Sequence, residues 1–302
     1  MVRRLLVLVA FAAVLTSLSC GASPTGFRPI AGSRQFVLHI HVVGSGGYDP
    51  NTRGLQTDYM ALQLPFDPEH NLATAGDDQW FTWSTLFPKS FPTQRGWGVF
   101  AAWKGVGLGF DGEANLRLDV TDDELRLYVR GGNPDVMKAR DGRLLFRPNP
   151  QYGRRYEEAY DLGPLRRGVW QTFYFHVRWS PTPSGLVELY RAIDGGRPVR
   201  LLAPHRVATL YADRPAVRYP IQDLYHEGGL NIGTVSDVYQ TPMQWADTLG
   251  AALTTASLQI TEGRWFGDPK SSGEFVPAAE VPVPLPERIR LPSRSARSAS
   301  SG

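Results

Sequence analysis

Hydrophobic and polar residues alternate along much of this chain, with the two-residue period of a β-strand whose two faces meet different surroundings. The alternating or apolar segments are 36–43, 58–64, 79–87, 97–104, 114–120, 124–130, 171–179, 186–191, 229–233 and 254–261. Clusters of Gly, Pro, Asn and Asp separate them, and a helical pattern is confined to residues 241–252. Many short strands between turns predict an all-β fold, a jelly-roll sandwich of two antiparallel sheets.

The alternation also predicts which side chains leave the core. In segment 171–179 the core-facing set is Phe173, Phe175, Val177 and Trp179, and the outward set is Thr172, Tyr174, His176 and Arg178. A face that mixes Tyr, His and Arg suits sugars, because planar Arg binds a carboxylate or sulfate through two hydrogen bonds. The alternative is an ordinary solvent face, because the period does not tell which sheet a strand joins.

The two ends of the chain differ in composition from its middle. Residues 1–22 combine a basic start with an apolar run and then small residues, which predicts an export signal. Cys20, the only cysteine, lies where such signals end, so a lipid tether to a membrane is an alternative to a secreted protein. Residues 26–265 are expected to form one jelly-roll domain. Residues 266–302 are rich in Pro, Ser and Arg and are expected to form a disordered tail.

The net charge of the chain limits the classes of ligand that it is expected to bind. The chain carries 32 basic and 29 acidic side chains, and two of the basic ones, Arg3 and Arg4, belong to the predicted signal. The mature body is therefore close to neutral, which argues against nucleic-acid binding. Any anionic ligand has to be held by local basic residues, and a monomer is expected.

Two segments resemble the heparin-lyase-I-like polysaccharide lyases. They are WFTWSTLFPKSFPTQRGWGVFAAWKG and LGPLRRGVWQTFYFHVRWSPTPSGLVELYRAIDGG. The resemblance implies a concanavalin A-like jelly roll whose concave face binds a uronic-acid polymer and cleaves it by β-elimination. That reaction requires a group that neutralises the C6 carboxylate, a base for the C5 proton and an acid for the departing oxygen.

The sequence departs from this family at catalytic positions. Where the family has Gln-Trp-His, this chain has Ala102, Trp103 and Lys104. A later Lys-x-Gly-x-Tyr motif best matches the stretch from Asn231 to Val235, which ends in valine. Three functions therefore stay open: a polysaccharide lyase with altered catalytic residues, a carbohydrate-binding module on the same scaffold, and a structural or adhesion domain.

The candidate catalytic residues are Lys104, His176 and Tyr174. Lys104 would bind a carboxylate or act as the base, unless it is a plain surface lysine. His176 would act as the base, with Tyr174 as the acid, unless this strand face binds nothing. The candidate substrate-binding residues are Arg178, Arg117, Asn115, Tyr128, Arg130, Trp103 and Asn231.

No metal or cofactor is predicted. His39 and His41 share one face of the first strand, but the spacing fixes no third ligand. The acidic cluster Asp119, Asp122, Asp123 and Glu124 lies at a hairpin, where a structural Ca²⁺ is the alternative to a plain turn. Tyr225, His226 and Glu227 are expected in a loop that could supply another acid or base. The expected partner is an acidic polysaccharide.

Overall fold

The structure is a computed structural model. It describes residues 36–46, 57–63, 72–105, 114–132, 135–138, 144–147, 157–212, 216–250, 264–268 and 270–286. The chain divides into a unit of residues 1–33 and a unit of residues 34–302, and every described residue belongs to the second unit. The predicted export signal, including Cys20, therefore lies outside the described residues.

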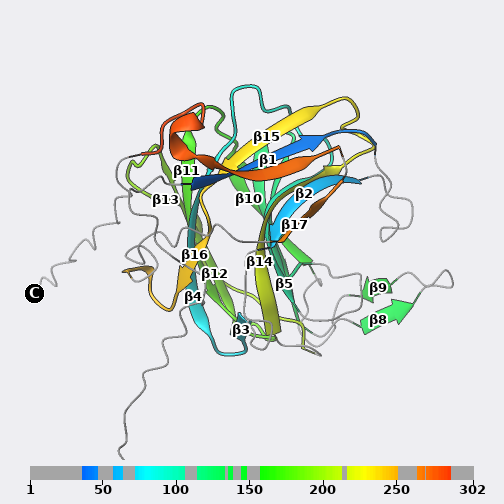
Figure 1. The fold of residues 1–302 in the computed structure, drawn as a ribbon. Helices are drawn as coiled ribbons and strands as arrows, with labels where there is room; N and C mark the ends of the chain where they lie inside the picture. The colour runs from blue at the N-terminus through cyan, green and yellow to red at the C-terminus, as the bar shows by residue number, and fades with distance from the viewer. Residues whose placement is uncertain are drawn as a thin grey trace, which may run out of the picture. The chain divides into compact units, whose positions relative to one another are not determined.

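One of the two large sheets, called here the first sheet, has the strand order β13-β12-β11-β4-β15-β1-β18, and β16 also pairs with β4. Its strands are β1 (Phe36–Val43), β4 (Asp78–Leu86), β11 (Trp170–Arg178), β12 (Leu186–Ile193), β13 (Val199–Arg206), β15 (Val235–Gln240), β16 (Gln244–Ala246) and β18 (Ser272–Pro277). Strands far apart in the sequence lie side by side in it, such as β1 and β15 (Figure 1).

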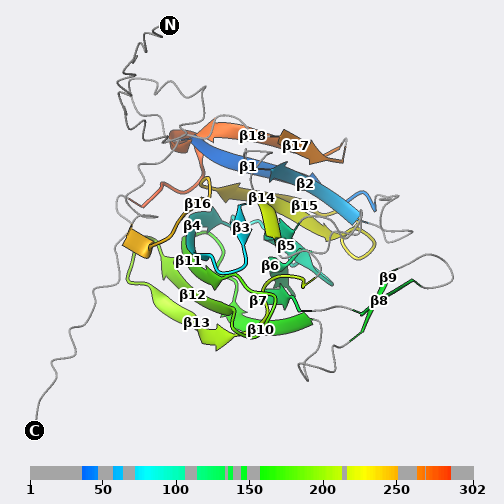
Figure 2. The same ribbon diagram turned by 90° about the horizontal axis from the view of Figure 1, so that it is seen from below.

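The second sheet has the order β10-β7-β6-β5-β14-β2-β17, and β3 also pairs with β14. Its strands are β2 (Thr57–Gln63), β3 (Ala73–Thr74), β5 (Gly98–Gly105), β6 (Leu116–Thr121), β7 (Glu124–Arg130), β10 (Glu157–Pro164), β14 (Ala216–Glu227) and β17 (Arg264–Gly267). The short strands β8 (Asp135–Lys138) and β9 (Leu144–Arg147) form a separate pair, and a 3-10 turn, η3, spans Ala278–Glu280. Figure 2 shows the same strands from below.

The predicted all-β sandwich of two antiparallel sheets is confirmed, since every pairing between these strands is antiparallel. The alternation of hydrophobic and polar residues along each strand explains why one face of each sheet is buried. On β11 the side chains of Phe173, Phe175 and Val177 are fully buried, whereas His176 is half-buried and Arg178 is exposed. Each large sheet therefore has a core face and an outer face, the latter turned away from the sandwich interior.

Aromatic packing joins the two sheets. Trp103 of β5 is fully buried, and its ring centroid lies 5.0 Å from that of Phe175, 5.3 Å from that of Phe81 and 5.8 Å from that of Trp83. The three partners come from β11 and β4 of the first sheet. Rings of this size bury a large apolar area, and edge-to-face contacts at these distances add to that stabilisation.

A second part of the interior is polar and hydrogen-bonded. His226 of β14 has its Nδ1 2.8 Å from Oε1 of Gln94, and Gln94 donates to the hydroxyl of Ser236 on β15. Gln222 donates to the side-chain oxygen of Gln240 at 3.0 Å. Buried polar groups need such partners, and these bonds cross from one sheet to the other.

Several predicted elements differ from the structure. Residues 229–233 form a turn between β14 and β15, because the Asn231 side chain bonds to backbone groups there rather than pairing in a sheet. A short helix was expected within residues 241–252; the strand β16 occupies residues 244–246 there and pairs with β4, and residues 249–250 are helical. The segment 254–261 lies outside the described residues.

The folded body continues past the expected boundary at residue 265. Strand β18 lies within the stretch predicted to be a disordered tail, and it pairs with β1 through six residues of each strand. The strand β18 was not predicted because the stretch is polar and rich in Pro. Since β18 lies at a sheet edge and buries no residue completely, its sequence lacks a strong hydrophobic pattern. No helix in the described part of the chain is long and apolar enough to cross a membrane.

Removing the Trp103 ring tests the packing between the sheets. Trp103→Ala is expected to lower the free energy of unfolding by about 3–5 kcal/mol, because it leaves a cavity among the three remaining aromatic rings. Urea unfolding followed by circular dichroism measures the change. Val199→Ala, at a position that is 64% exposed, is the control and should change stability by less than about 0.5 kcal/mol. Equal stability of the two variants would contradict this account of the core.

Candidate functional site

The predicted site residues fall on opposite sides of the sandwich. Tyr174, His176 and Arg178 lie on the outer face of the first sheet, because their neighbours on β11 fill the core. Lys104 and Arg117 lie on the outer face of the second sheet, where they alternate with buried residues of β5 and β6. The structure therefore does not bring the candidate catalytic residues Lys104, His176 and Tyr174 together on one face.

Several predicted substrate-binding residues are enclosed by the fold. Trp103 belongs to the core described above, and Asn115 and Arg130 are buried. Asn231 holds a turn by donating from Nδ2 to the carbonyl oxygens of Arg95 and Glu227. Sequence alternation shows which way a side chain points, but it does not show what covers the face to which it points.

Tyr174 is also enclosed, although it points away from the core. Its side chain is 1% exposed, and burial raises the pKa of its hydroxyl to about 12. Among the described residues the hydroxyl oxygen has no hydrogen-bond partner. A hydroxyl that is so deeply buried is poorly placed to reach a polymer.

On the first sheet, His176 and Arg178 are already paired with carboxylates. Arg178 donates from Nε and Nη2 to Oδ2 of Asp78 at 2.9 and 2.8 Å, and Nε2 of His176 contacts the other oxygen of Asp78. Nδ1 of His176 lies 3.5 Å from Glu188, and Trp80 stacks on the imidazole with centroids 4.4 Å apart. Burial raises the pKa of Asp78, but the bonds from His176 and Arg178 outweigh it and lower the pKa overall.

On the second sheet, a charged group surrounds Lys104. It comprises Lys104, Arg117, Asp119, Tyr128 and Asp223, and we call it the Lys104 group. Nη2 of Arg117 lies 3.3 Å from Oδ2 of Asp119, and its guanidinium carbon lies 4.4 Å from the ring centroid of Tyr128. Within the described part of the chain, Lys104 forms no hydrogen bond and no ion pair closer than 4 Å. Its ammonium acts on Asp223 through charge alone.

Asp223 determines the charge of this group. It is 5% exposed, and burial raises the pKa of its carboxyl well above the usual 3.8. Lys104 and Arg117 lower that pKa and Asp119 raises it, but burial is the largest effect. Burial therefore favours the protonated, uncharged form of this carboxyl, and in that form two cations, Lys104 and Arg117, face one anion, Asp119.

Asp223 was not among the predicted site residues, because strand β14 was not predicted from the sequence. Once β14 is known, the alternation is plain. Gln222 and Leu224 are buried toward the first sheet, where Gln222 bonds to Gln240, so Asp223 between them points outward.

Aromatic side chains flank the Lys104 group. The ring centroid of Tyr225 lies 4.7 Å from that of Trp97 and 5.6 Å from that of Tyr59, and Trp97 and Tyr225 pack on the small residues Val99 and Ala102. All three rings are half-buried, so part of each remains accessible. On β14, Tyr225 follows Asp223 by two residues, and it is paired with Val99, whereas Lys104 is paired with Tyr219 further along the strand. Half-buried rings on the same sheet face as a cation are suited to pack against neighbouring sugar rings.

The triplet Tyr225, His226 and Glu227 ends β14 and is not a loop. His226 points into the core, where burial lowers its pKa despite the nearby carboxylate of Asp58. A buried neutral imidazole cannot serve as an exposed acid or base.

The acidic cluster at the β6–β7 hairpin is explained by the turn itself. Asp122 and Asp123 have φ of 48° and 67°, which matches the two-residue turn that joins adjacent strands. The carboxylate of Asp123 pairs with Arg167 and accepts a hydrogen bond from Thr93. Asp119 lies elsewhere, facing Arg117 on the outer face of the sheet.

A profile of the family described as polysaccharide lyase matches residues 59–219. The chain belongs to the polysaccharide lyase family. This confirms the resemblance at the level of the family, and the narrower likeness to the heparin-lyase-I-like group stays a prediction. The matched segment includes Lys104, Arg117 and Tyr128, and it ends four residues before Asp223. No curated protein matches the sequence.

Solved structures resemble this one distantly. An endo-β-1,4-glucuronan lyase from the fungus Trichoderma reesei is 11% identical with a TM-score of 0.45, and the match covers 70% of this chain and 87% of that one. The GH131 β-glucanase catalytic domain from Podospora anserina is 12% identical at 0.43, covering 70% and 71%. A PL-14 alginate lyase from Aplysia kurodai is 14% identical at 0.41, covering 58% and 71%. Structural matches with such low sequence identity and TM-score give no information about the reaction or the ligand of this protein.

Replacing Asp223 tests its neutral state. Its raised pKa means that the folded protein holds a proton that the unfolded chain loses near pH 4, so this residue costs stability as pH rises above that value. Asp223→Asn should therefore stabilise the protein at pH 8 and change its stability little at pH 3, where the carboxyl is protonated in the folded and the unfolded chain alike. Urea unfolding at the two pH values measures this.

The exposed Asp161 provides the matched control for Asp223. Its side chain is 86% exposed, so Asp161→Asn should not produce the same pH-dependent gain. A gain from Asp223→Asn that is equal at pH 3 and pH 8 would show that the carboxyl is not held neutral.

Proposed function

We propose that this protein binds a uronic-acid-containing polysaccharide on the outer face of the second sheet, with Lys104 and Arg117 holding a uronate carboxylate. One observation carries the proposal: the Lys104 ammonium has no ion-pair partner among the described residues, and burial raises the pKa of the nearby Asp223 carboxyl. A cation with an available bonding position attracts an anion more strongly than one already paired, such as Arg178.

The charges of the Lys104 group fit one carboxylate. With Asp223 neutral, Lys104 and Arg117 exceed Asp119 by one positive charge. A protonated carboxyl also donates a hydrogen bond, so Asp223 can bind the same uronate that Lys104 neutralises. The rings of Trp97, Tyr225 and Tyr59 pack together further along the same strands and offer surfaces for neighbouring sugar rings.

Cleavage by β-elimination is the second candidate function, and the membership in the polysaccharide lyase family favours it. Lys104 and Asp223 would stabilise the charge that develops next to the carboxylate. Tyr128 is the side chain of the group suited to move a proton, and the Arg117 guanidinium lies over its ring. Ala102 takes the place of the family's neutralising amide, which is the reason to keep a purely binding function as the alternative.

Export is part of the same proposal, since an acidic polysaccharide is met outside the cytoplasm. The predicted signal of residues 1–22 would direct the protein there, and Cys20 would decide between a secreted and a lipid-anchored form. A structural or adhesion domain is the remaining alternative, in which Lys104 has no role.

The experiment compares binding and turnover on alginate, glucuronan and heparin, with an uncharged polymer as the reference. Calorimetry measures binding, and absorbance of the unsaturated uronate measures cleavage. Lys104→Ala should weaken binding about 10- to 100-fold, because a hydrogen bond to a charged group is worth about 1.5–3 kcal/mol. Lys104→Arg should retain most of the affinity, and Arg178→Ala on the opposite sheet should change it little.

The outcomes separate the candidates. A rise in absorbance that Tyr128→Phe reduces about 100-fold or more, with binding preserved, supports the lyase. Binding without any absorbance change supports the binding module. Absence of binding to every acidic polymer leaves only the structural or adhesion domain.

A further inference from the structure

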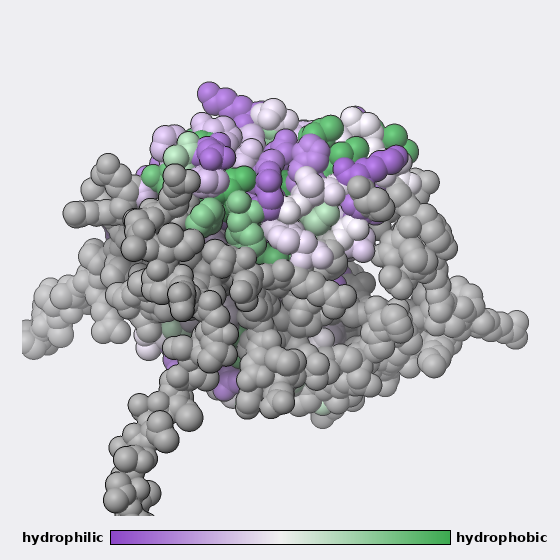
Figure 3. Space-filling model, viewed as in Figure 1, coloured by the Kyte–Doolittle hydropathy of each residue, from purple (hydrophilic) through white to green (hydrophobic). Residues whose placement is uncertain are grey.

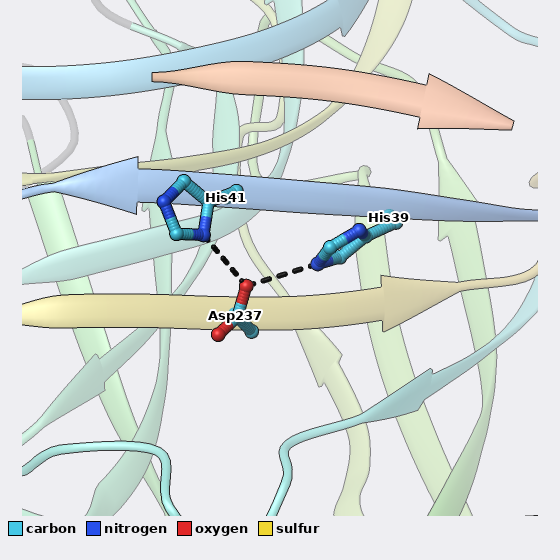
Figure 4. Close-up of side chains that lie close together, drawn as sticks. All are labelled: His39, His41 and Asp237. Atoms are coloured by element: carbon cyan, nitrogen blue, oxygen red, sulfur yellow. Dashed lines mark hydrogen bonds and ion pairs between the residues drawn. The ribbon is translucent and has the colours of Figure 1, made fainter. Parts of the chain in front are cut away.

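Two histidines and one aspartate converge on the outer face of the first sheet. Nε2 of His39 lies 2.9 Å from Oδ1 of Asp237, and Nδ1 of His41 lies 2.8 Å from the same oxygen. Figure 4 shows both imidazoles, from β1, directed at the carboxylate, from β15. The three ligand atoms all lie within 4.8 Å of one another.

The strand pairing explains this convergence. Leu38, Ile40 and Val42 of β1 are fully buried, so His39 and His41 between them point outward. β15 runs antiparallel beside β1 and places Asp237 directly opposite His41. The third ligand is thus 196 residues from His41 in the sequence, which is why spacing along the chain predicted none.

We propose that His39, His41 and Asp237 form a binding site for a divalent transition metal such as Zn²⁺. Imidazole nitrogen and carboxylate oxygen are ligands that Zn²⁺ accepts at about 2.0–2.2 Å, most often in a tetrahedron whose neighbouring ligand atoms lie about 3.4 Å apart. The separations of 2.8 and 2.9 Å are hydrogen-bond distances, and an outward shift of each imidazole by about 0.5 Å would admit the ion. Three protein ligands leave further positions for water or another ligand.

The residues around His39 support the proposal independently of the three ligands. Oε1 of Glu274, on β18, lies 3.2 Å from Nδ1 of His39, the ring nitrogen that does not face Asp237. Metal-binding histidines usually donate their second ring N–H to a carboxylate or carbonyl, which fixes the tautomer that leaves the other nitrogen free to bind metal. Tyr239 stacks on the same imidazole, with centroids 4.5 Å apart and planes 5° apart, and so orients it.

The charge of the surrounding carboxylates and the exposure of the three side chains also suit a divalent metal ion. The carboxylates of Asp237 and Glu274 balance a divalent cation when both histidines are neutral. The side chains of His39, His41 and Asp237 are 20%, 31% and 31% exposed, which leaves a route for the ion. Polar side chains gather over β1, β15 and β18 in the space-filling view (Figure 3).

The other histidine with two carboxylates on this sheet is less suited to a metal. His176 contacts Asp78 and Glu188, but Asp78 also accepts two bonds from Arg178 and Glu188 accepts one from Tyr190. A cation there would have to displace an arginine, whereas no arginine or lysine bonds to Asp237 or Glu274 in any interaction found among the described residues.

The site is distinct from the Lys104 group, which lies on the opposite sheet. It joins β1 to β15 through the ligands and to β18 through Glu274. A bound metal would therefore link strands from both ends of the domain and stabilise the folded chain, because it binds the folded state only.

The test uses the full chain without a polyhistidine tag, treated with EDTA and then titrated with Zn²⁺ alone by calorimetry. We expect one Zn²⁺ per chain and a higher melting temperature in its presence. His41→Ala and Asp237→Asn should each weaken binding at least 10-fold, and Glu274→Gln should weaken it about 10- to 100-fold. Substitution by Co²⁺ should give visible absorption bands, and these should disappear in His41→Ala.

His205→Ala is the matched control, because His205 is also a histidine beside a carboxylate, 3.4 Å from Glu158, and should leave binding unchanged. Equal Zn²⁺ affinity in wild type, His41→Ala and Asp237→Asn would overturn the proposal, as would absence of stoichiometric binding. Should a ligand variant fail to fold, NMR of the wild-type imidazoles decides. Zn²⁺ must shift the resonances of His39 and His41 and leave that of His205 in place, and any other result overturns the site.

Discussion

The packing of Trp103 against Phe81, Trp83 and Phe175 is the contact on which the arrangement of this protein depends. It fixes β5 of the second sheet against β4 and β11 of the first. Once that ring points inward, the period of the strand turns its neighbours Ala102 and Lys104 to the opposite face. The core contact therefore also decides where a cation is presented.

Both sheets carry polar and aromatic groups on their outer faces, but the cations on the two faces differ in whether a carboxylate pairs with them. On the first sheet Arg178 and Arg200 lie beside the carboxylates of Asp78 and Glu188. On the second sheet burial raises the pKa of Asp223, the carboxyl near Lys104, and so favours its uncharged form. The distinction between a paired and an available cation separates a stabilising network from a surface able to hold an acidic polymer.

The first sheet has a second kind of polar group at its other end. There, β1, β15 and β18 bring His39, His41, Asp237 and Glu274 together with no arginine or lysine among the contacts found in the described residues. The two imidazole nitrogens and the carboxylate oxygen lie within 4.8 Å of one another, which is close enough for them to bind one metal ion. The two outer faces thus support two different chemistries on one scaffold.

The sequence by itself determined the all-β class, most of the strands with a strong two-residue period, and the inward or outward direction of side chains such as Phe175, His176 and Lys104. These are local properties, because alternation needs only neighbouring residues. The sequence did not reveal β18, whose side chains are only partly buried at a sheet edge, nor β14, which carries Asp223.

Only the tertiary structure decided which outward-pointing side chains from different strands become neighbours. It separated His176 from Lys104 on opposite sheets, covered Tyr174, and placed Asp237 beside two histidines from the start of the fold. The physical reason is that strand partners and register are set by contacts between segments far apart in the chain, and a one-residue shift would reverse every face. Burial, which raises the pKa of Asp223, is likewise a property of the assembled sheets and not of the residue.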